Sequence, residues 1–223
     1  MPLLGPAAML LQFDVAPEAV AEHDEWHTHE HLPERLSIPG FLRGTRWTAA
    51  QGGPRYCVLY EVEHLDTLSS RPYLERLNSP SAWTQKMMPH YRGMTRGFCA
   101  VAASFGAGTG RTAWLLRFKP GPDTEAFLVN ELFPPLSSRR GIAGAHLLRG
   151  AATPPMTSEQ RIRGADAGVD CALLVVGYGD QAAAGIDASA LEHRGASAVL
   201  ETAYRLDASL ARGEPVFESR KTS

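Results

Sequence analysis

Four of the eight histidines of this 223-residue chain lie within nine residues, at positions 23, 27, 29 and 31. Imidazole titrates near neutral pH and serves as a general acid, a general base or a metal ligand. In a helix, His23, His27 and His31 share one face because they are spaced four residues apart. The spacing predicts a row of imidazoles on one helix face, and a solvated helix with incidental histidines is the alternative interpretation.

The elements around this row repeat once along the chain. The first cycle has strand patterns at 7–15, 40–49, 55–64 and 95–104, and helical patterns at 17–38 and 66–91. The second cycle has strand patterns at 112–120, 142–151, 170–179 and 197–206, and helical patterns at 122–138 and 187–196. Each half therefore has the order β-α-β-β-α-β, and the glycine-rich residues 106–110 form the boundary.

Residue types also agree between the halves. An offset of 101 places Trp26 on Phe127, Glu30 on Glu131, Pro33 on Pro134 and Gly40 on Gly141. This agreement indicates an ancient tandem duplication. A proline inside a helix removes one hydrogen bond and clashes with the preceding turn, so we expect a kink at Pro33 and at its counterpart.

A β-α-β-β-α-β unit folds as a four-stranded antiparallel sheet with both helices on one face. Strands that are apolar on both sides, such as 173–176, need cover on the second face as well. We therefore predict an α+β fold of two ferredoxin-like repeats, packed sheet to sheet with the helices outside. Residues 1–108 form the first repeat, which carries the histidine cleft, and residues 109–223 form the second, degenerate repeat.

The second half lacks the polar residues of the first. At the same offset His27 maps to Leu128 and His31 to Leu132, which lie four apart on an apolar helix face. We expect His27 and His31 to point toward their sheet, and His29 to be exposed. Burying an imidazole without a partner costs about 1–3 kcal/mol. The two interpretations are a functional cleft between helix and sheet, or core histidines with satisfied hydrogen bonds.

The strands after this helix offer further polar side chains. Arg46 maps to Leu147 at the same offset. Tyr60 and Glu61 have Val175 and Val176 as counterparts in the equivalent strand pattern, so the same asymmetry occurs a second time. Glu61 follows Tyr60, and adjacent strand residues point to opposite faces. Which of the two faces the cleft stays open at this point.

The composition restricts the partners of the chain. Its 22 basic and 24 acidic residues give a net charge of −2, without a block of like charges, which disfavours nucleic-acid binding. No apolar stretch approaches the roughly 20 residues that span a bilayer. The three cysteines lie in apolar, strand-like runs, which is typical of buried thiols in a reducing cytosol. We expect a soluble, cytoplasmic protein without a nucleic-acid or membrane partner.

The spacing of His27 and His31 is also that of a helical zinc pair. Thr28 stands where such sites carry glutamate, and no further Cys or His pattern completes a ligand set. The sequence has no haem-attachment motif, phosphate loop or dinucleotide-binding glycine pattern. We expect no cofactor, with zinc and haem as the alternatives.

The run W-x4-H-x-P, followed by P-G-F-x4-R, extends from Trp26 to Arg46, and Tyr56-x3-Tyr60-Glu61 follows it. Together with the segment 78–83, this run resembles the dimeric α+β barrel superfamily, and within it the EthD-like proteins. The resemblance covers the first half well and the second half only in element order and in its proline and glycine positions.

The resemblance implies a fold, a site and a range of activities. The chain resembles a pseudo-dimeric α+β barrel that keeps one site between helices and sheet, with further pairing into a homodimer left open. His31 is the position of the family histidine. Known activities of the family are cofactor-free aromatic polyketide cyclases and monooxygenases, lactone isomerases and haem-dependent peroxidases.

Our leading hypothesis is a small-molecule enzyme that transfers a proton on a hydrophobic, cyclic or aromatic carbonyl compound. The expected catalytic residues are His31 as acid or base, His27 as its partner, and Arg46 and Tyr60 as stabilisers of a developing oxyanion. The expected substrate-binding residues are Trp26, His23, Glu61 and Trp83. The alternative is a non-catalytic binding or accessory protein for an apolar small molecule.

The connection 151–169 has no counterpart in the first half, where residues 51–54 suffice. We expect a solvated surface loop, with a lid as the alternative.

Overall fold

The computed structural model describes residues 3–152, 157–179 and 188–213. Its strands are β1 (Ala7–Val15), β2 (Phe41–Ala49), β3 (Tyr56–Val62), β4 (Tyr91–Gly106), β5 (Thr112–Lys119), β6 (Ile142–Ala151), β7 (Cys171–Gly177) and β8 (Ser197–Ala211). The helices of the first half are η1 (Pro17–Ala19), α1 (Val20–Trp26), η2 (His27–His31), α2 (Leu32–Leu36), η3 (Leu65–Ser69), α3 (Arg71–Asn78), α4 (Ala82–Met87) and η4 (Met88–His90). Those of the second half are α5 (Thr124–Phe127), η5 (Leu128–Leu132), α6 (Phe133–Ser137), α7 (Ser158–Arg163) and α8 (Ser189–Glu192).

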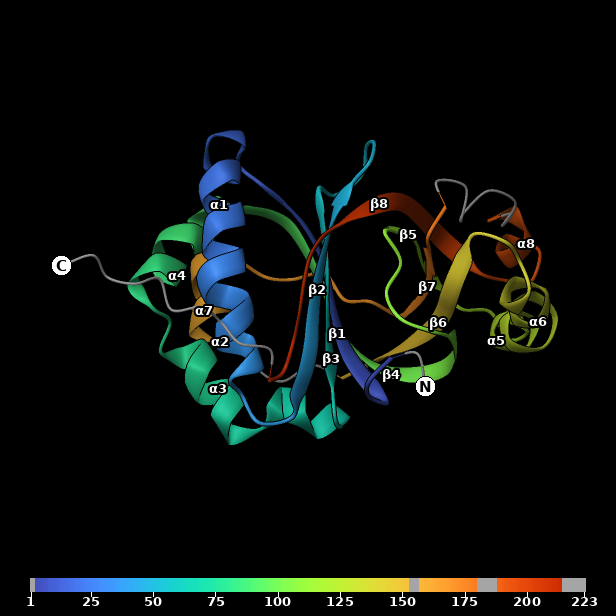
Figure 1. The fold of residues 1–223 in the computed structure, drawn as a ribbon, viewed down its shortest axis with the longest axis horizontal. Coiled ribbons are helices and arrows are strands. Elements are labelled where there is room, and N and C mark those ends of the chain that lie inside the picture. Colours follow the sequence, from blue (N-terminus) through green and yellow to red (C-terminus); the bar gives the residue numbers. More distant parts are fainter. Residues whose placement is uncertain (1–2, 153–156, 180–187, 214–223) are drawn as a thin grey trace.

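The strands close into one antiparallel barrel in the order β1-β3-β2-β8-β5-β7-β6-β4 (Figure 1). Within the first half, β1 pairs with β3 and β4, and β2 pairs with β3. Within the second half, β5 pairs with β7 and β8, and β6 pairs with β7. The α+β class predicted from the sequence is confirmed.

The two sheets meet at their edges. The sequence pattern predicted sheet-to-sheet packing, and the resemblance implied a barrel. Pairing of β2 with β8 and of β4 with β6 joins the two sheets edge to edge into one closed barrel. The long strands β4 and β8 make both connections possible, because each pairs with its own half at one end and with the other half at the other. Hydrogen bonding across both seams satisfies the backbone groups that open sheet edges would leave unpaired.

Three apolar clusters show which side each residue faces. Trp26 and Tyr60 belong to the cluster between the first-half strands and their helices. Leu59 and Cys57 belong to the cluster inside the barrel, and Leu128 to the one beneath the second-half helices. Because β3 and β7 have cover on both faces, all residues of both strands are buried; β7 is apolar throughout, and β3 is apolar apart from one glutamate and the tyrosine hydroxyls.

The helices form two layers on opposite sides of the barrel. Figure 1 shows α1 to α4 on one side and α5, α6 and α8 on the other. Helix α7 belongs to the second half by sequence. It nevertheless lies in the layer of α1 to α4, where it packs against α3 and η4.

The connection that contains α7 is therefore not the solvated surface loop expected from the sequence. The side chains of Thr157, Glu159 and Gln160 are buried against the first half. Thr157 forms a capping box with Gln160, which satisfies the backbone donors at the start of α7. Sequence periodicity could not detect this helix, because its buried face is polar.

Both halves contain a π turn at the same place. In η2 the amide of Leu32 donates to the carbonyl of His27, five residues earlier, and in η5 Phe133 donates to Leu128. A proline follows each turn, at Pro33 and its counterpart, where we had expected a kink. A π turn of this kind widens one turn of the helix and is frequent at functional sites.

Candidate active site between the first helix and β3

The row of imidazoles lies on the inner face of the continuous helix made by α1, η2 and α2. His23, His27 and His31 have relative exposures of 0%, 2% and 8%, whereas the His29 side chain is 68% exposed. The ring centroids of His23 and His27 are 5.5 Å apart, and those of His27 and His31 are 5.4 Å apart. The helical spacing thus places three rings side by side against the sheet, as the sequence predicted.

His23 has hydrogen-bond partners on both ring nitrogens. Its Nε2 lies 3.3 Å from the hydroxyl of Tyr91, and its Nδ1 lies 3.3 Å from Oδ1 of Asp24. Tyr56 donates to the same carboxylate oxygen at 2.6 Å. Burial lowers the pKa of His23, although Asp24 opposes the shift. These contacts are those of a core histidine with satisfied hydrogen bonds.

His27 is different, because half of its hydrogen-bonding capacity is unused. Its Nε2 lies 3.5 Å from the hydroxyl of Tyr60, at the limit of a hydrogen bond. Its Nδ1 is buried and has no hydrogen-bond partner in the described part of the chain. Burial, together with the nearby charges of His23, Arg46 and Arg35, holds its pKa well below the usual range. His27 is therefore neutral at pH 7 and has one nitrogen to offer a ligand.

His31 lies at the end of the row, against Trp26. The two ring centroids are 4.3 Å apart, and Nδ1 of His31 lies 3.9 Å from Oε2 of Glu34. Burial raises the pKa of Glu34. The carboxyl group thus lies near the imidazole, at ion-pair distance but beyond hydrogen-bonding distance.

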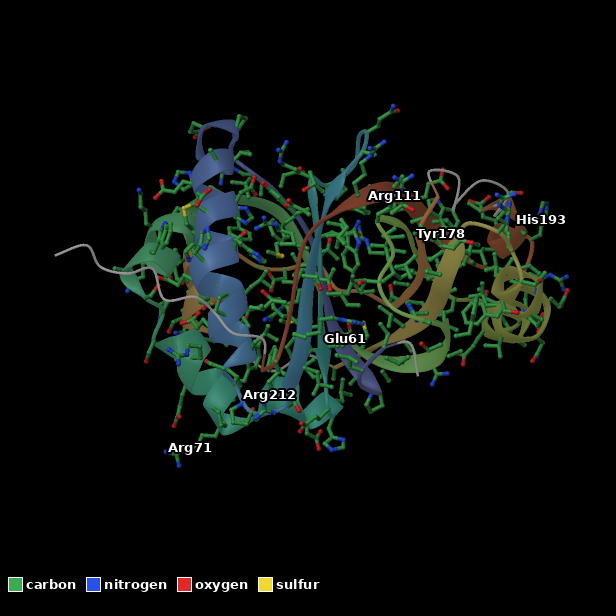
Figure 2. All side chains as sticks on the ribbon, viewed as in Figure 1. Glu61, Arg71, Arg111, Tyr178, His193 and Arg212 are labelled. Atoms are coloured by element: carbon green, nitrogen blue, oxygen red, sulfur yellow. The ribbon has the colours of Figure 1, made fainter. Side chains whose placement is uncertain are left out.

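The orientation of β3 decides between Tyr60 and Glu61. Tyr60 faces the helices, and burial raises the pKa of its phenol far above the usual value. Glu61 faces the barrel interior, where it accepts from Nε of Arg43 at 2.6 Å and from the amide of Leu4 at 2.6 Å. Figure 2 shows Glu61 among the strands, away from the helix layer. Glu61 is therefore not brought together with the histidines.

Arg46 reaches the helix, but its donors are already engaged. Its Nε donates to Asp207 at 2.7 Å, and its Nη2 donates to Thr28 at 3.1 Å. Its Nη1 lies 3.4 Å from the carbonyl oxygen of Asp24. These contacts connect α1 and η2 to the strands β2 and β8. Arg46 therefore fixes the helix that carries the histidine row against the sheet.

The two tryptophans lie on different sides of the site. Trp26 is fully buried, beside His31, and its Nε1 donates to Glu30 at 3.1 Å. Trp83, on α4, is partly buried and donates to Glu22 at 3.2 Å. Trp26 is an apolar wall of the histidine row, whereas Trp83 packs at the margin of the same apolar cluster.

Sequence reasoning missed Arg35 and Glu159. Arg35 is 2% exposed, and its Nη2 donates to both carboxylate oxygens of Glu159 on α7, at 2.6 and 2.8 Å. A sequence signal existed for Arg35, since it continues the four-residue spacing of His27 and His31. No signal existed for Glu159, which lies 124 residues further along the chain.

In the second half, apolar residues occupy the positions equivalent to this site. Leu128, Leu147 and Val175 occupy the positions of His27, Arg46 and Tyr60, and all three are buried in the second-half cluster. The predicted asymmetry between the halves is therefore present in three dimensions as well as in the sequence.

Within residues 3–152, 157–179 and 188–213, no group of three or more His, Cys, Asp or Glu side chains is arranged to hold a metal ion. All three cysteines are buried free thiols. No helix in these ranges is long and apolar enough to cross a membrane.

A hollow of about 290 Å³ lies next to the histidine row. It is lined by Tyr91, Gly93, Met94, Ala165 and Ala167. Tyr91 belongs both to this wall and to the hydrogen bond with His23. The hollow therefore approaches the row from the end at His23 and does not include His27.

The fold is a closed eight-stranded antiparallel barrel with helices on two sides. Its likeness to solved structures extends over nearly the whole chain. An anthrone oxidase-like protein superposes with a TM-score of 0.63 at 13% identity, over 96% of this chain and 97% of the other. A "putative monooxygenase" of Fusobacterium nucleatum superposes with a TM-score of 0.60 at 8% identity, over 95% and 97%.

A third structure, a "putative monooxygenase" of Lactobacillus acidophilus, has a TM-score of 0.55 at 10% identity and covers 96% of this chain and 100% of its own. No family model and no curated protein matches the sequence. At these identities the likeness shows a shared fold, and the activity has to be argued from the site.

Proposed function

We propose that this chain is a small-molecule enzyme of the monooxygenase-like kind, acting on a hydrophobic, cyclic or aromatic carbonyl compound by proton transfer. The observation that carries the proposal is the buried, unpartnered Nδ1 of His27, whose opposite nitrogen faces the hydroxyl of Tyr60. Leaving a buried polar atom without a partner costs stability, so a ligand that supplies one is favoured. The names of the structural neighbours support the same class of chemistry.

The chemistry follows from the two sides of the His27 ring. When Nε2–H donates to Tyr60, the lone pair of Nδ1 is free to accept a proton from a carbon next to a carbonyl group. The C–H electron pair then moves into the carbonyl, which becomes an enolate or phenolate. The Tyr60 hydroxyl is the nearest donor to such an oxyanion.

His31 completes the proton path in this proposal. It stands 5.4 Å from His27 between ring centroids and next to the carboxyl of Glu34. The proton is relayed outward through His31, the position that resembles the family histidine. Arg46 and Trp26 fix the position of the histidine row. His23, at the N-terminal end of the row, has a structural role.

Entry of the substrate requires movement. Nδ1 of His27 is closed to solvent, and α7 packs against the neighbouring elements α3 and η4. The proposed substrate therefore enters when side chains around the row, or α7 itself, shift. The apolar surroundings favour a flat, hydrophobic compound over a charged one.

The test is turnover of a panel of anthrones, quinones and lactones under air, with products identified by mass spectrometry. Conversion by the wild type, lost in His27→Leu, Tyr60→Phe and His31→Ala, is the expected result. His29→Leu, an exposed histidine on the same helix, is the matched control and keeps full activity. Retained conversion in His27→Leu and Tyr60→Phe contradicts the proposal.

Binding of the panel without any conversion favours the accessory, ligand-binding alternative. A visible absorption spectrum of the purified protein tests for haem, and elemental analysis tests for zinc.

We further propose that the two halves descend from a tandem duplication of one ferredoxin-like repeat. The shared 101-residue offset of the π turns supports this origin.

A further inference from the structure

Helix α7 belongs to the second half but is anchored at both ends to the first. At its start, Asn78 Oδ1 accepts from the amide and hydroxyl of Ser158, at 3.1 and 3.2 Å. Beyond its end, Ala167 exchanges backbone hydrogen bonds with β4, accepting from Arg96 and donating to Met94, each at 2.9 Å. The segment 157–167, called the strap below, is thus attached at both ends to the first half, and its helix lies in the layer that carries the histidines (Figure 1).

One side chain of the strap reaches into this layer. The Glu159 carboxylate is 3% exposed and receives two hydrogen bonds from the Arg35 guanidinium, which is itself 2% exposed. A bidentate, charge-assisted pair fixes both the position and the orientation of the guanidinium. Glu34 also accepts from Arg35, at the longer distance of 3.3 Å.

The pair lies beside the phenol that the proposed function uses. His27 on η2 lies 3.5 Å from the Tyr60 hydroxyl. The groups whose charges act on Tyr60 include Arg35 on α2, Tyr73 on α3, Glu159 on α7 and Arg46 on β2. The two guanidinium groups favour the phenolate, whereas the Glu159 carboxylate opposes it. Glu159 is the one carboxylate in this set.

We propose that Glu159 is a positioning residue of the first-half site, which holds the Arg35 guanidinium beside Tyr60 and balances its charge there. This inference rests on the proposed function for its catalytic consequence. The second half, which carries apolar residues at the equivalent positions, then completes the site of the first half by means of the strap. The phenol stays protonated and keeps the hydrogen that it donates to an oxyanion.

The experiment removes the negative charge of Glu159 and keeps the size of its side chain. In Glu159→Gln the strap keeps a side chain of the same size, but the buried guanidinium next to Tyr60 loses its main counter-charge. An uncompensated positive charge near an acidic group lowers its pKa, by about one unit or more when the two lie within about 4–6 Å. Carbon-13 NMR of ζ-labelled tyrosine follows each ring through an alkaline titration, and Tyr60→Phe assigns the signal.

The matched control is a substitution at Asp166, which weakens a different attachment of the strap. Asp166 bonds to Arg96 at 3.0 Å and accepts from Gln160 at 2.9 Å, away from Arg35. In Asp166→Asn the Tyr60 titration is expected to stay at its wild-type position. If the Glu159→Gln variant does not fold, the pair Arg35→Met with Glu159→Leu removes both charges, and the Tyr60 signal is then expected to titrate no lower than in the wild type.

The two readouts separate the inference from the proposed function. A lower Tyr60 titration in Glu159→Gln alone supports the inference even when no substrate turns over. In a catalytically active protein, the alkaline limb of the kcat profile is expected to shift down by the same amount. An unchanged titration, or the same shift in Asp166→Asn, overturns the positioning role and leaves Glu159 as a structural anchor of the strap.

Discussion

His27 and Leu128 hold the same place in two equivalent π turns, each accepting a hydrogen bond from the amide five residues later. Both side chains are buried, one beside Tyr60 and the other among aliphatic residues. The backbone is therefore able to carry either an imidazole or an aliphatic side chain at this position. The imidazole is a requirement of the site rather than of the fold.

Exchanging these two residues is expected to give opposite results. His27→Leu removes a buried nitrogen without a partner and copies a side chain that the fold accepts, so the free energy of unfolding at pH 7 stays the same or rises. Leu128→His buries an imidazole in an apolar cluster, and the expected loss is about 1–3 kcal/mol. Urea denaturation of both variants measures the difference.

Activity is expected to follow the reverse order. Leu128→His keeps turnover in the folded protein, because the change lies under the second helix layer, and His27→Leu loses it. A His27→Leu variant that is several kcal/mol less stable than the wild type contradicts this view and makes the ring a structural part of the core.

The buried histidines also predict how stability depends on pH. Burial lowers the pKa values of His23 and His27, and it lowers the pKa of His146 to about 4. The unfolded chain takes up protons on these rings near pH 6.5, while the folded chain does not. The free energy of unfolding is therefore expected to fall as the pH drops from about 7 to 5. The slope approaches about 1.4 kcal/mol per pH unit for each ring.

Denaturation curves at several pH values between 5 and 8 test this expectation. His27→Leu removes one of the rings, so its slope is expected to be shallower than that of the wild type. His29→Gln changes an exposed ring and serves as the control, with an unchanged slope. A flat wild-type curve over this range shows that the rings are not held neutral in the folded state.

Two equivalent glycines give a matched test of backbone strain. Gly40 and Gly141 precede β2 and β6 with φ values of +89° and +93°, a conformation that residues with a Cβ atom rarely adopt. A Cβ atom at Gly40 would lie 2.8 Å from Thr67, whereas at Gly141 it would meet nothing within 4 Å.

Replacing each glycine by alanine therefore separates strain from collision. Gly141→Ala is expected to cost about 1–3 kcal/mol from the backbone conformation alone. Gly40→Ala adds the contact with Thr67, so its melting temperature is expected to be the lower of the two. Equal losses would show that Thr67 moves away without cost.

Most of the fold could be predicted from the sequence because it depends on local patterns. The alternation of strands and helices, the 101-residue offset and the burial of His27 and His31 follow from periodicity and from the comparison of the halves. The barrel was expected only from the family resemblance, because periodicity does not show how far β4 and β8 extend past their own sheets.

The candidate site shows the same limit. Tyr60 was recognised by its apolar counterpart in the second half, but its orientation relative to Glu61 required the register of β3. Glu159 was not recognised, because a polar residue in a long connection is ordinarily solvated. Its burial depends on Arg35, a contact between distant parts of the chain that no periodicity encodes.

Breaking the buried pair of Arg35 and Glu159 is expected to be among the more destabilising single changes in this protein. Removing one partner leaves an uncompensated charge in the core, and such changes cost about 3–5 kcal/mol. Glu159→Ala is therefore expected to lower the free energy of unfolding by that amount. Glu131→Ala, which breaks the exposed pair with Arg194, is the control and changes stability by less than about 1 kcal/mol.

The double variant Arg35→Met with Glu159→Leu decides what the pair contributes. Apolar residues of similar volume in place of a buried ion pair are often neutral or stabilising, because no charge has to be desolvated. We expect the double variant to recover most of the stability lost in Glu159→Ala, as measured by urea denaturation. If the double variant is as unstable as Glu159→Ala, the strap depends on the ion pair itself for its attachment. If it is stable but inactive towards a substrate that the wild type converts, the pair is kept for the site that it completes.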